Sequence, residues 1–430
     1  MNRRLELFPQ NTRIENGELM LGGLSARELA QKFGTPLYLF DQAELDSAVS
    51  RYRRALAEFW PGASAITYAG KAFLNTRMAQ WAQGQGLRVD CTGQGEIELA
   101  VHAGLSAREI LVHGVSKSRA DLLSALRHAG TLVADNLSEL RHLAALPAAD
   151  KIQIWLRYQP GLAVETHAYT QTGHSGSKFG MGAAELLQAA QFCRANGLRL
   201  TGIHFHQGSQ FRDPAPLGPA IDAALELAAQ MNLDSGWHFC PGGGWGVAYH
   251  EDELPQPNVA GYVRFVAERA LAGIKRLGLE PPTLHLEPGR SLAARAGVAL
   301  YRVETVKRSG GRVWALVDGG LADNPRPALY GARYSCLPAN QVPARDMEEV
   351  SIAGPYCESG DILIASTRLP RVQEGEVLAI PVSGAYHLSM ASNYNGARRP
   401  ALVWLAQGRA SLVRRREENS ILWAADVEPD

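Results

Sequence analysis

The stretch Ser64-Ala-Ile-Thr-Tyr-Ala-Gly-Lys-Ala-Phe73 runs from an apolar, β-prone segment into a glycine and then a lysine. This pattern predicts a buried strand that ends at Gly70 and presents Lys71 at its carboxyl end. A lysine placed there loses hydration, which lowers its pKa and lets the amine attack a carbonyl. The same ten residues are also compatible with a solvated lysine in a loop, so the rest of the chain has to decide between the two interpretations.

Similar apolar runs recur as far as about residue 290 and alternate with segments of helical periodicity. Eight strands with interleaved helices predict a (β/α)8 barrel, whose active site lies at the carboxyl ends of the strands. The eight runs are 65–68, 87–90, 110–113, 132–134, 152–157, 202–206, 237–240 and 283–286. The polar residues that end or follow them are Lys71, Asp90, His113, Asp135, Arg157, His206, the glycines 242–244 and Glu287.

Outside these runs the pattern differs at both ends of the chain. Ser25-Ala-Arg-Glu28 predicts the capped start of a helix that stops at Gly34, and a second helix is expected to open at Asp41. After Arg290, period-two and β-branched runs separated by Gly and Pro predict a β domain. Its expected strands lie within 298–306, 312–317, 361–365, 377–382 and 401–405.

Composition limits the kinds of partner. A chain of 430 residues with 46% hydrophobic residues suits about two globular domains. Lys plus Arg and Asp plus Glu both number 43, so no net field draws the chain to nucleic acid or anionic lipid. Residues 1–20 lack an apolar export segment, and no run of about eighteen apolar residues occurs. We therefore expect a cytoplasmic protein with no membrane span and a small-molecule partner.

The cysteines are odd in number and widely scattered. This spacing argues against a disulfide framework or a paired-cysteine zinc module and leaves room for a working thiol. The five are Cys91, Cys193, Cys240, Cys336 and Cys357.

Two glycine- and histidine-rich segments carry candidate binding groups. In Cys240-Pro-Gly-Gly-Gly-Trp245 the backbone N–H groups are free to surround an anion such as a phosphate, although a tight turn alone would also need these glycines. In Gly-Ile-His204-Phe-His206 both imidazoles share one face of a strand. They are candidates for metal ligation or for stacking on a planar cofactor, and His204 also suits a hydrogen-bonded core position.

Acidic, basic and thiol groups cluster in three later motifs. His285-Leu-Glu287-Pro-Gly-Arg290 offers a carboxylate that can keep a ring nitrogen protonated and a guanidinium that can clamp an anion, or else a structural ion pair. Cys357-Glu358 offers proton donation and amine recognition, or an inert turn. Arg326-Pro-Ala-Leu-Tyr330 and Ser-Gly-Ala-Tyr386 add a guanidinium and two phenols in expected loops.

Together these motifs resemble the fold type III pyridoxal-phosphate decarboxylases, particularly the branch that acts on diaminopimelate. The resemblance covers nearly the whole chain and rests on motifs in the family's order. They are Tyr-Ala-Gly-Lys71-Ala-Phe, His-Phe-His206-Gln-Gly-Ser-Gln, Pro-Gly-Gly-Gly244, Glu287-Pro-Gly-Arg-Ser, Arg326-Pro-Ala-Leu-Tyr, Cys357-Glu-Ser-Gly-Asp and Gly-Ala-Tyr386 followed by Met-Ala-Ser-Asn-Tyr-Asn.

The resemblance implies an α/β protein: an alanine-racemase-like (β/α)8 TIM barrel at 41–288, a β-barrel domain at 289–430, and an N-terminal segment, 1–40, that packs with the β-barrel domain. It also implies a cytoplasmic homodimer with shared active sites that makes L-lysine from meso-diaminopimelate with pyridoxal 5'-phosphate as cofactor. Catalytic roles fall to Lys71, His206, Glu287 and Cys357. Cofactor contacts fall to Lys71, His206, Ser209, Gly243, Gly244, Glu287, Gly289, Arg290 and Tyr386, and substrate contacts to Arg290, Arg326, Tyr330, Glu358 and Tyr386.

By the same resemblance, Cys357 and Glu358 come from the partner subunit, as proton donor and as reader of the substrate amine. Departures from the family pattern bear on the substrate: Gly114-Val-Ser-Lys117 replaces the usual Gly-Asn-Asn-Lys, Gly-Ala-Arg-Tyr follows Tyr330, and the loop 172–179 has small residues in its middle. Decarboxylation of D-ornithine, D-lysine or a siderophore or antibiotic intermediate is therefore an alternative.

Two other classes of protein remain as alternatives. One is a metal-dependent barrel hydrolase with His204 and His206 as ligands, although no metal is expected here. The other is a non-catalytic homologue that regulates a decarboxylase, against which Lys71 and Cys357 argue.

Overall fold

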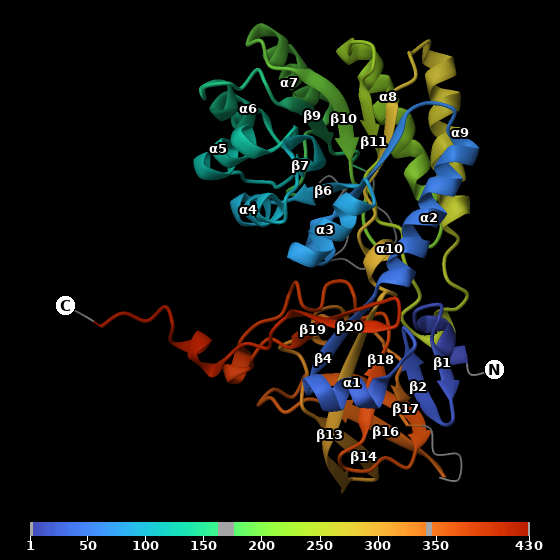
Figure 1. Cartoon of the computed structure of the whole chain (residues 1–430). Helices are drawn as coiled ribbons and strands as arrows, with labels where there is room; N and C mark the ends of the chain where they lie inside the picture. The colour runs from blue at the N-terminus through green and yellow to red at the C-terminus, as the bar shows by residue number, and fades with distance from the viewer. Residues whose placement is uncertain (1–2, 162–175, 341–345, 429–430) are drawn as a thin grey trace. The chain divides into compact units, whose positions relative to one another are not determined.

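A computed structural model of the chain describes residues 3–161, 176–340 and 346–428 (Figure 1). The chain divides into two compact units. The barrel unit comprises 48–246 and 257–291, and the sheet unit comprises 1–47, 247–256 and 292–430.

These bounds differ from the expected division after residues 40 and 288 in three places, one of which is residues 289–291, which group with the barrel unit. Residues 41–47 group with the sheet unit because Asp41 ends a strand of its sheet and Oδ1 of the same residue caps the next helix. Residues 247–256 group there because Glu251 forms an ion pair with Arg4, at 2.8 Å, and accepts a hydrogen bond from Ser335.

The barrel unit contains the eight parallel strands that the apolar runs predict. They close in chain order, each hydrogen-bonded to the next, and β12 pairs with β5. The strands are β5 (Ser64–Ala69), β6 (Arg88–Cys91), β7 (Ile110–Val112), β8 (Thr131–Ala134), β9 (Gln153–Tyr158), β10 (Leu200–Phe205), β11 (His238–Cys240) and β12 (Thr283–Leu286). The prediction of a (β/α)8 barrel is confirmed.

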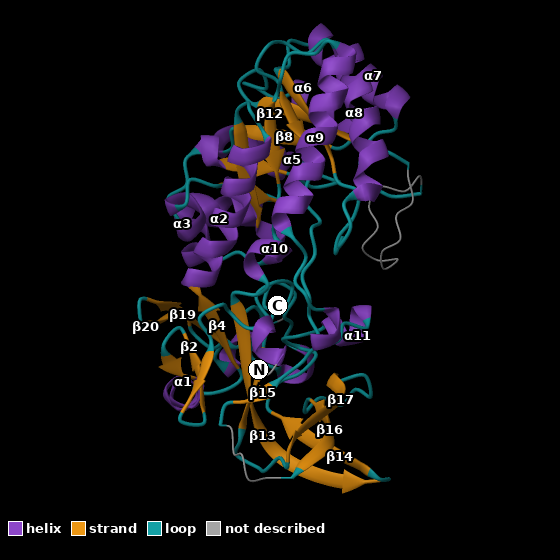
Figure 2. Cartoon of the chain, turned by 90° about the vertical axis from the view of Figure 1, so that its right-hand side faces the viewer, coloured by secondary structure: helices purple, strands orange, loops and turns teal. Residues whose placement is uncertain are grey.

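Helices surround this barrel (Figure 2). Their ends follow the capping residues in the sequence: the side chain of Asn258 accepts the N–H groups of Ala260 and Gly261 at the start of α9, and Gly278 ends that helix in the left-handed conformation. The helices are α2 (Gln42–Phe59), α3 (Thr76–Gly84), α4 (Gln94–His102), α5 (Arg119–His128), α6 (Leu137–Ala144), α7 (Ala183–Ala195), α8 (Gly218–Met231) and α9 (Val259–Leu277). Short 3-10 turns are η2 (Gly70–Ala72), η3 (Ala107–Glu109) and η5 (Ala215–Leu217).

The sheet unit holds a nine-stranded sheet in which the N-terminal strand β4 lies between β13 and β19. This confirms that the N-terminal part of the chain contributes to the β domain. The strands are β4 (Leu37–Asp41), β13 (Gly297–Ser309), β14 (Arg312–Val317), β15 (Leu337–Pro338), β16 (Met347–Ala353), β17 (Ile362–Pro370), β18 (Val377–Ile380), β19 (Ala401–Ala406) and β20 (Arg409–Arg414).

The remaining elements of this unit are short. A three-stranded sheet precedes α1, whose N-cap Ser25 accepts the N–H of Glu28 at 3.4 Å as predicted. The elements are η1 (Arg3–Leu7), β1 (Arg13–Glu15), β2 (Glu18–Leu21), β3 (Leu24–Ser25), α1 (Ala26–Phe33), η6 (Glu251–Glu253), α11 (Arg326–Tyr330), η7 (Tyr394–Gly396) and η8 (Asn419–Leu422). Helix α10 (Arg290–Ala293) spans the boundary between the units in the sequence.

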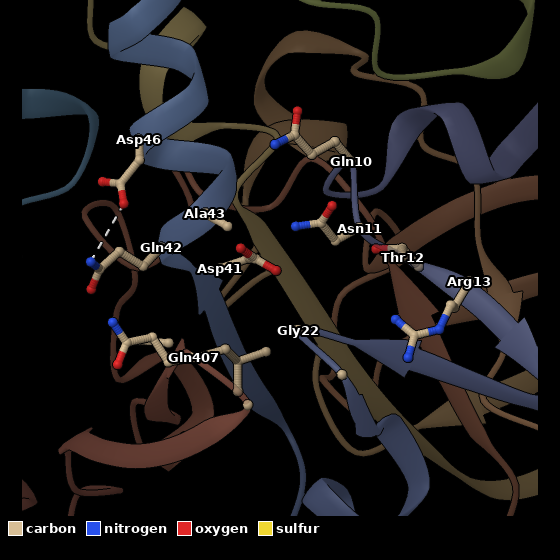
Figure 3. A pocket seen from close by; sticks show the side chains of 14 residues that line it. Gln10, Asn11, Thr12, Arg13, Gly22, Asp41, Gln42, Ala43, Asp46 and Gln407 are labelled. Carbon is tan, nitrogen blue, oxygen red and sulfur yellow. Dashed lines mark hydrogen bonds between the residues drawn. The ribbon is translucent and has the colours of Figure 1, made fainter.

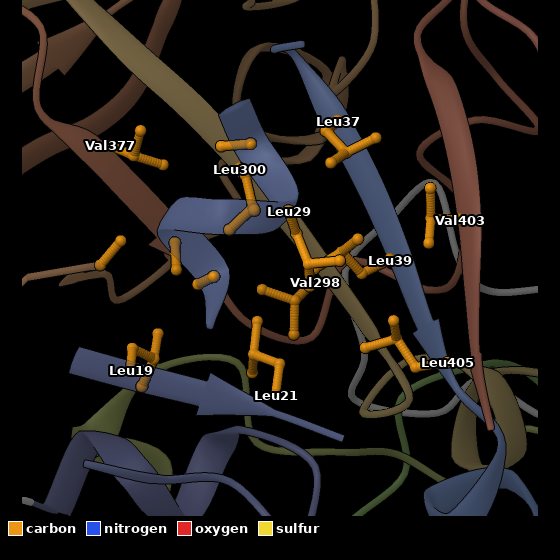
Figure 4. Close-up of a cluster of buried hydrophobic side chains, with 14 of the residues drawn as sticks. Leu19, Leu21, Leu29, Leu37, Leu39, Val298, Leu300, Val377, Val403 and Leu405 are labelled. Carbon is orange, nitrogen blue, oxygen red and sulfur yellow. The ribbon is translucent and has the colours of Figure 1, made fainter. Parts of the chain in front are cut away.

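One face of the central strands forms the core of the sheet unit (Figure 4). Leu39 on β4 lies beside Val298 on β13 and Val403 on β19, and residues two positions apart on each strand point the same way. Leu29 of α1 and Leu21 of β2 cover this apolar face.

In the described part of the chain no helix is long and apolar enough to cross a membrane.

Candidate active site

The carboxyl ends of the barrel strands gather most of the predicted site residues. Lys71 lies in η2 directly after β5, and Glu287 directly follows β12, the neighbouring strand. The backbone N–H of Ala69 donates to the carbonyl of Pro288 at 3.2 Å and ties these two segments together. Strand-end position therefore brings together residues that are more than two hundred positions apart in the sequence.

A buried carboxylate lies at the centre of this group. Glu287 is 7% exposed, and each of its oxygens meets an imidazole: His113 Nε2 lies 3.0 Å from Oε1 and His204 Nε2 lies 2.9 Å from Oε2. The sequence placed His113 at a strand end and left His204 as a candidate for metal ligation, stacking or a hydrogen-bonded core position, but assigned neither a role beside Glu287. The strand order could have predicted this contact, since the carboxyl ends of the parallel strands β7, β10 and β12 all lie at the same end of the barrel.

The protonation states follow from burial. Burial lowers the pKa of His204 to about 4, so its ring is neutral near pH 7 and its Nε2–H donates to Glu287. Burial alone would raise the pKa of Glu287, but the two neighbouring imidazoles outweigh it and hold the pKa well below its usual value. Glu287 is therefore an ionised carboxylate inside the barrel.

Beside Glu287, a glycine turn packs tightly against the backbone of neighbouring segments. A Cβ on Gly243 would overlap the carbonyl oxygen of Glu287, and one on Gly244, where φ is +98°, would overlap the carbonyl oxygen of Gly208. Only glycine fits these two positions. Nearby, the Arg290 guanidinium donates to Ser209 Oγ at 3.0 Å, so a buried cation, a hydroxyl and backbone N–H groups meet in one region. This donor set suits a phosphate.

The expectation that Lys71 loses its hydration is wrong, because its side chain is exposed at the turn after β5. Its positive charge still acts on the site. Together with burial, the larger effect, it lowers the pKa of His206, and it partly offsets the rise that burial causes in the pKa of Asp90. His206 Nδ1 accepts the N–H of Gly243 at 3.3 Å, which places this ring against the glycine turn.

The segment that departs from the family pattern is anchored by its lysine. Lys117 is buried, and its ammonium donates to the carbonyls of Gly114 and Val133 and to Glu139 at 2.8–2.9 Å. The replaced residues therefore lie in a turn that Lys117 fixes. In another of these departures, the loop 172–179, residues 172–175 lie outside the described part of the chain.

The remaining substrate candidates lie in the sheet unit. Arg326 is buried, with its guanidinium 4.3 Å from the centre of the Tyr249 ring, and it donates to Tyr334. Among the described residues Arg326 forms no ion pair with a carboxylate. The prediction that Arg326–Tyr330 lies in a loop is wrong, because these residues form the short helix α11, which Tyr330 ends. Tyr386 is half-buried with a φ of +61°, a strained conformation for a tyrosine.

Cys357 and Glu358 are both exposed, in a loop that one carboxylate organises. Asp361 accepts the N–H of Leu321 at 2.7 Å and that of Tyr356 at 3.0 Å, and these two hydrogen bonds hold the loop in place. The Cys357 N–H donates to Asn395 Oδ1 at 3.0 Å. The other four cysteines are buried, and burial raises the pKa of each thiol. Cys357 is thus the accessible cysteine.

The residues that could hold a metal ion in the structure differ from the expected pair. Within the described residues, the group with ligand atoms close enough to hold an ion is His113, His204 and Glu287, all within 4.8 Å of one another. The expected pair His204 and His206 does not form it, because His206 lies past the end of β10 and contacts the glycine turn. Each Glu287 oxygen in this group already accepts a hydrogen bond from an imidazole. This arrangement suits a carboxylate with a role other than binding a metal ion.

The chain matches a family model described as "Pyridoxal-dependent decarboxylase, pyridoxal binding domain" over residues 43–294. It is 39% identical to a diaminopimelate decarboxylase of Bacillus subtilis, over 94% of both chains. It is 38% identical to that of Actinosynnema pretiosum, over 98% of this chain and 95% of the relative. A solved diaminopimelate decarboxylase from M. jannaschii in complex with L-lysine is 29% identical, with a TM-score of 0.90 over 98% of both chains.

Proposed function

Because the chain belongs to the family of pyridoxal-dependent decarboxylases, we propose that it decarboxylates meso-diaminopimelate at the D-configured centre and releases L-lysine. The enzyme class is a pyridoxal-phosphate-dependent carboxy-lyase that acts on an amino acid. The choice of substrate is supported by one observation, the similarity along nearly the full length of relatives that carry this activity in their names.

The barrel residues fit the cofactor. Lys71 would hold it covalently, and the glycine turn at Gly243 and Gly244, with Ser209 and Arg290 beside it, would bind its phosphate, with the N–H of Gly244 as the donor while that of Gly243 donates to His206. The imidazole of His206 would stack on its ring. Gly289 is the remaining proposed cofactor contact in the barrel unit, and a Cβ there would lie 3.0 Å from Ala69 Cβ, so glycine lets these two segments pack closely.

Glu287 would act on the ring nitrogen. An ionised, buried carboxylate stabilises a proton on that nitrogen, and His113 and His204 fix its orientation. When bound, the cofactor's ring withdraws electrons from the carbon that loses its carboxylate as carbon dioxide. That carbon must then accept a proton, for which Cys357 is the proposed donor.

Substrate recognition would divide among residues of the sheet unit. Arg326 is a buried cation with aromatic neighbours and no described carboxylate partner, so a substrate carboxylate would complete its environment. Tyr330 would add a hydroxyl to this contact, and Arg290 and Tyr386 are the further proposed contacts of the substrate. Glu358 would pair with the distal ammonium.

We further propose that the enzyme is a homodimer in which Cys357 and Glu358 enter the partner's active site. Both side chains are exposed on a loop that Asp361 and Asn395 hold in place, so they are presented outward from the sheet unit. Pairing of two identical chains by a twofold axis would supply each loop to the other site.

Release of carbon dioxide from a panel of amino acids tests the substrate. We expect the highest kcat/KM for meso-diaminopimelate, with D-lysine, D-ornithine and larger amino acids far below it. A preference for D-ornithine or D-lysine would replace the proposed substrate while keeping the enzyme class.

The attachment of the cofactor has a separate test. Borohydride reduction of the yellow holoenzyme followed by peptide mapping should place the pyridoxyl group on Lys71, and a Lys71→Ala variant should carry none. A label on another lysine would contradict the assignment of Lys71.

A further inference from the structure

A second candidate binding site lies in the sheet unit, at the start of helix α2 (Figure 3). Its cavity volume is about 710 Å³, within the range of small-molecule sites and far more than a bare metal ion needs. Four segments line it: residues 10–13, the turn 22–23, residues 41–43 with Asp46, and the hairpin 405–408. None of these residues has a role in the active site proposed above.

At the buried end of this cavity lies a carboxylate, one of whose oxygens accepts no hydrogen bond from the described residues. Asp41 is 3% exposed and lies at the centre of the lining residues in Figure 3. Its Oδ1 accepts the N–H of Glu44 at 3.1 Å and so caps α2, whereas Oδ2 has no hydrogen-bond partner among the described residues. An unpaired carboxylate oxygen of this kind destabilises the fold unless a donor, best a positively charged one, meets it.

The other lining groups favour a cationic, polar ligand. Asp46 adds a second carboxylate, and the buried Thr12 Oγ1 also lacks a hydrogen-bond partner among the described residues. The one basic side chain in the lining, Arg13, is already paired with Glu15. Asn11 and Gln407 contribute amides that can donate to or accept from a ligand.

We propose that this cavity binds a small organic molecule with a protonated primary amine, whose ammonium group pairs with Asp41 Oδ2 and whose remaining polar atoms meet Thr12 and the amides. The cavity should disfavour anions, because two carboxylates line it and its guanidinium pairs with Glu15. Burial, with Glu44 and Asp46 nearby, raises the pKa of Asp41, and a bound ammonium would relieve that destabilisation of the charged form.

Calorimetric titration of the cofactor-loaded, full-length enzyme with 1,4-diaminobutane tests the proposal. Succinate is the matched control, because it has the same four-carbon length and the opposite charge. We expect saturable binding of the diamine, tighter than about 1 mM, and none of succinate. Binding of the diamine in the active site is recognised separately, since it changes the visible absorption of the cofactor and does not depend on Asp41.

Two pairs of variants locate the site. Asp41→Asn keeps the helix cap but removes the charge, and we expect it to lower the affinity for the diamine at least tenfold. The control is Asp222→Asn in helix α8, which does not line the cavity and should leave the affinity unchanged. Ala43→Arg places a tethered guanidinium at the cavity and should abolish binding, while Ala43→Gln should retain it. If Asp41→Asn does not fold, the Ala43 pair decides.

Three results would overturn the proposal: no diamine binding to the wild-type enzyme outside the active site, equal affinity in Ala43→Arg and Ala43→Gln, or succinate binding as tightly as the diamine.

Discussion

At the scale of single residues, the environment of Glu287 determines what its carboxylate can do. Both oxygens accept from imidazoles that come from other strands, and burial keeps water away. The sequence predicted that Glu287 would be important, because Glu-Pro-Gly-Arg ends an apolar run. It did not predict that His113 and His204 hold it, because those contacts join positions 174 and 83 residues away and depend on how the barrel closes.

Glu287→Gln should lower turnover at least about a hundredfold, on the order of 3 kcal/mol of transition-state stabilisation, because the amide keeps the shape but cannot stabilise a protonated ring nitrogen. The visible absorption should show that cofactor is still bound. Glu58→Gln, on the exposed face of α2, is the matched control and should retain full activity. Near-normal turnover in Glu287→Gln would exclude this role.

Asp323 provides a pH-dependent prediction. It accepts hydrogen bonds from Tyr38, at 2.9 Å, and from Tyr301, yet burial raises its pKa to about 6, above the usual value of about 3.9. The folded state therefore binds this proton more tightly than the unfolded state. The resulting stabilisation is complete below about pH 4 and disappears as the pH rises past about 6.

We expect the difference in free energy of unfolding between wild type and Asp323→Asn to fall by about 1 kcal/mol between pH 5 and pH 8. Chemical denaturation of both proteins across this interval measures the difference, and comparison with the variant cancels the other titrating groups. A difference that does not change with pH would contradict the raised pKa.

At the scale of elements, the glycine turn after β11 shows how strand, turn and site depend on one another. Gly243→Ala would drive a methyl group into the carbonyl of Glu287, so we expect the affinity for the cofactor to fall at least tenfold and the melting temperature to drop. In the control Gly95→Ala, near the start of α4, the methyl group meets open space and should leave stability equal or slightly higher. Normal cofactor affinity in Gly243→Ala would show that the turn tolerates the added methyl group.

The elements also show why some strands were predictable and others were not. The barrel strands are buried on both faces and read as continuous apolar runs such as Ile110–Val112. Strands β16 and β20 were not among the predicted strands, because β16 begins Met-Glu-Glu and β20 has polar residues at half of its positions and none that is fully buried. The exposure of Lys71 could also not be predicted from the sequence, since it depends on the 3-10 turn that follows β5.

At the scale of the whole molecule, the proposed sharing of active sites has a quantitative test. Lys71→Ala and Cys357→Ala are expected to be inactive alone, but a mixed dimer would contain one site with both residues intact. With random exchange about half of the dimers are mixed, so activity should recover to roughly a quarter of wild type. Mixing Lys71→Ala with Glu287→Gln is the control and should recover none, because both residues belong to the barrel unit. No recovery in the first mixture after verified exchange would place Cys357 in its own chain's site.

The position of β4 has a consequence for synthesis on the ribosome. This strand emerges early, but its neighbours β13 and β19 begin roughly 260 and 360 residues later. At 5 to 20 residues per second, β4 waits roughly ten to seventy seconds with its apolar residues unpaired, while the barrel strands that follow it can already close. Nascent chains stalled before β19 should therefore present Leu37 and Leu39 to chaperones, and chains released after it should not.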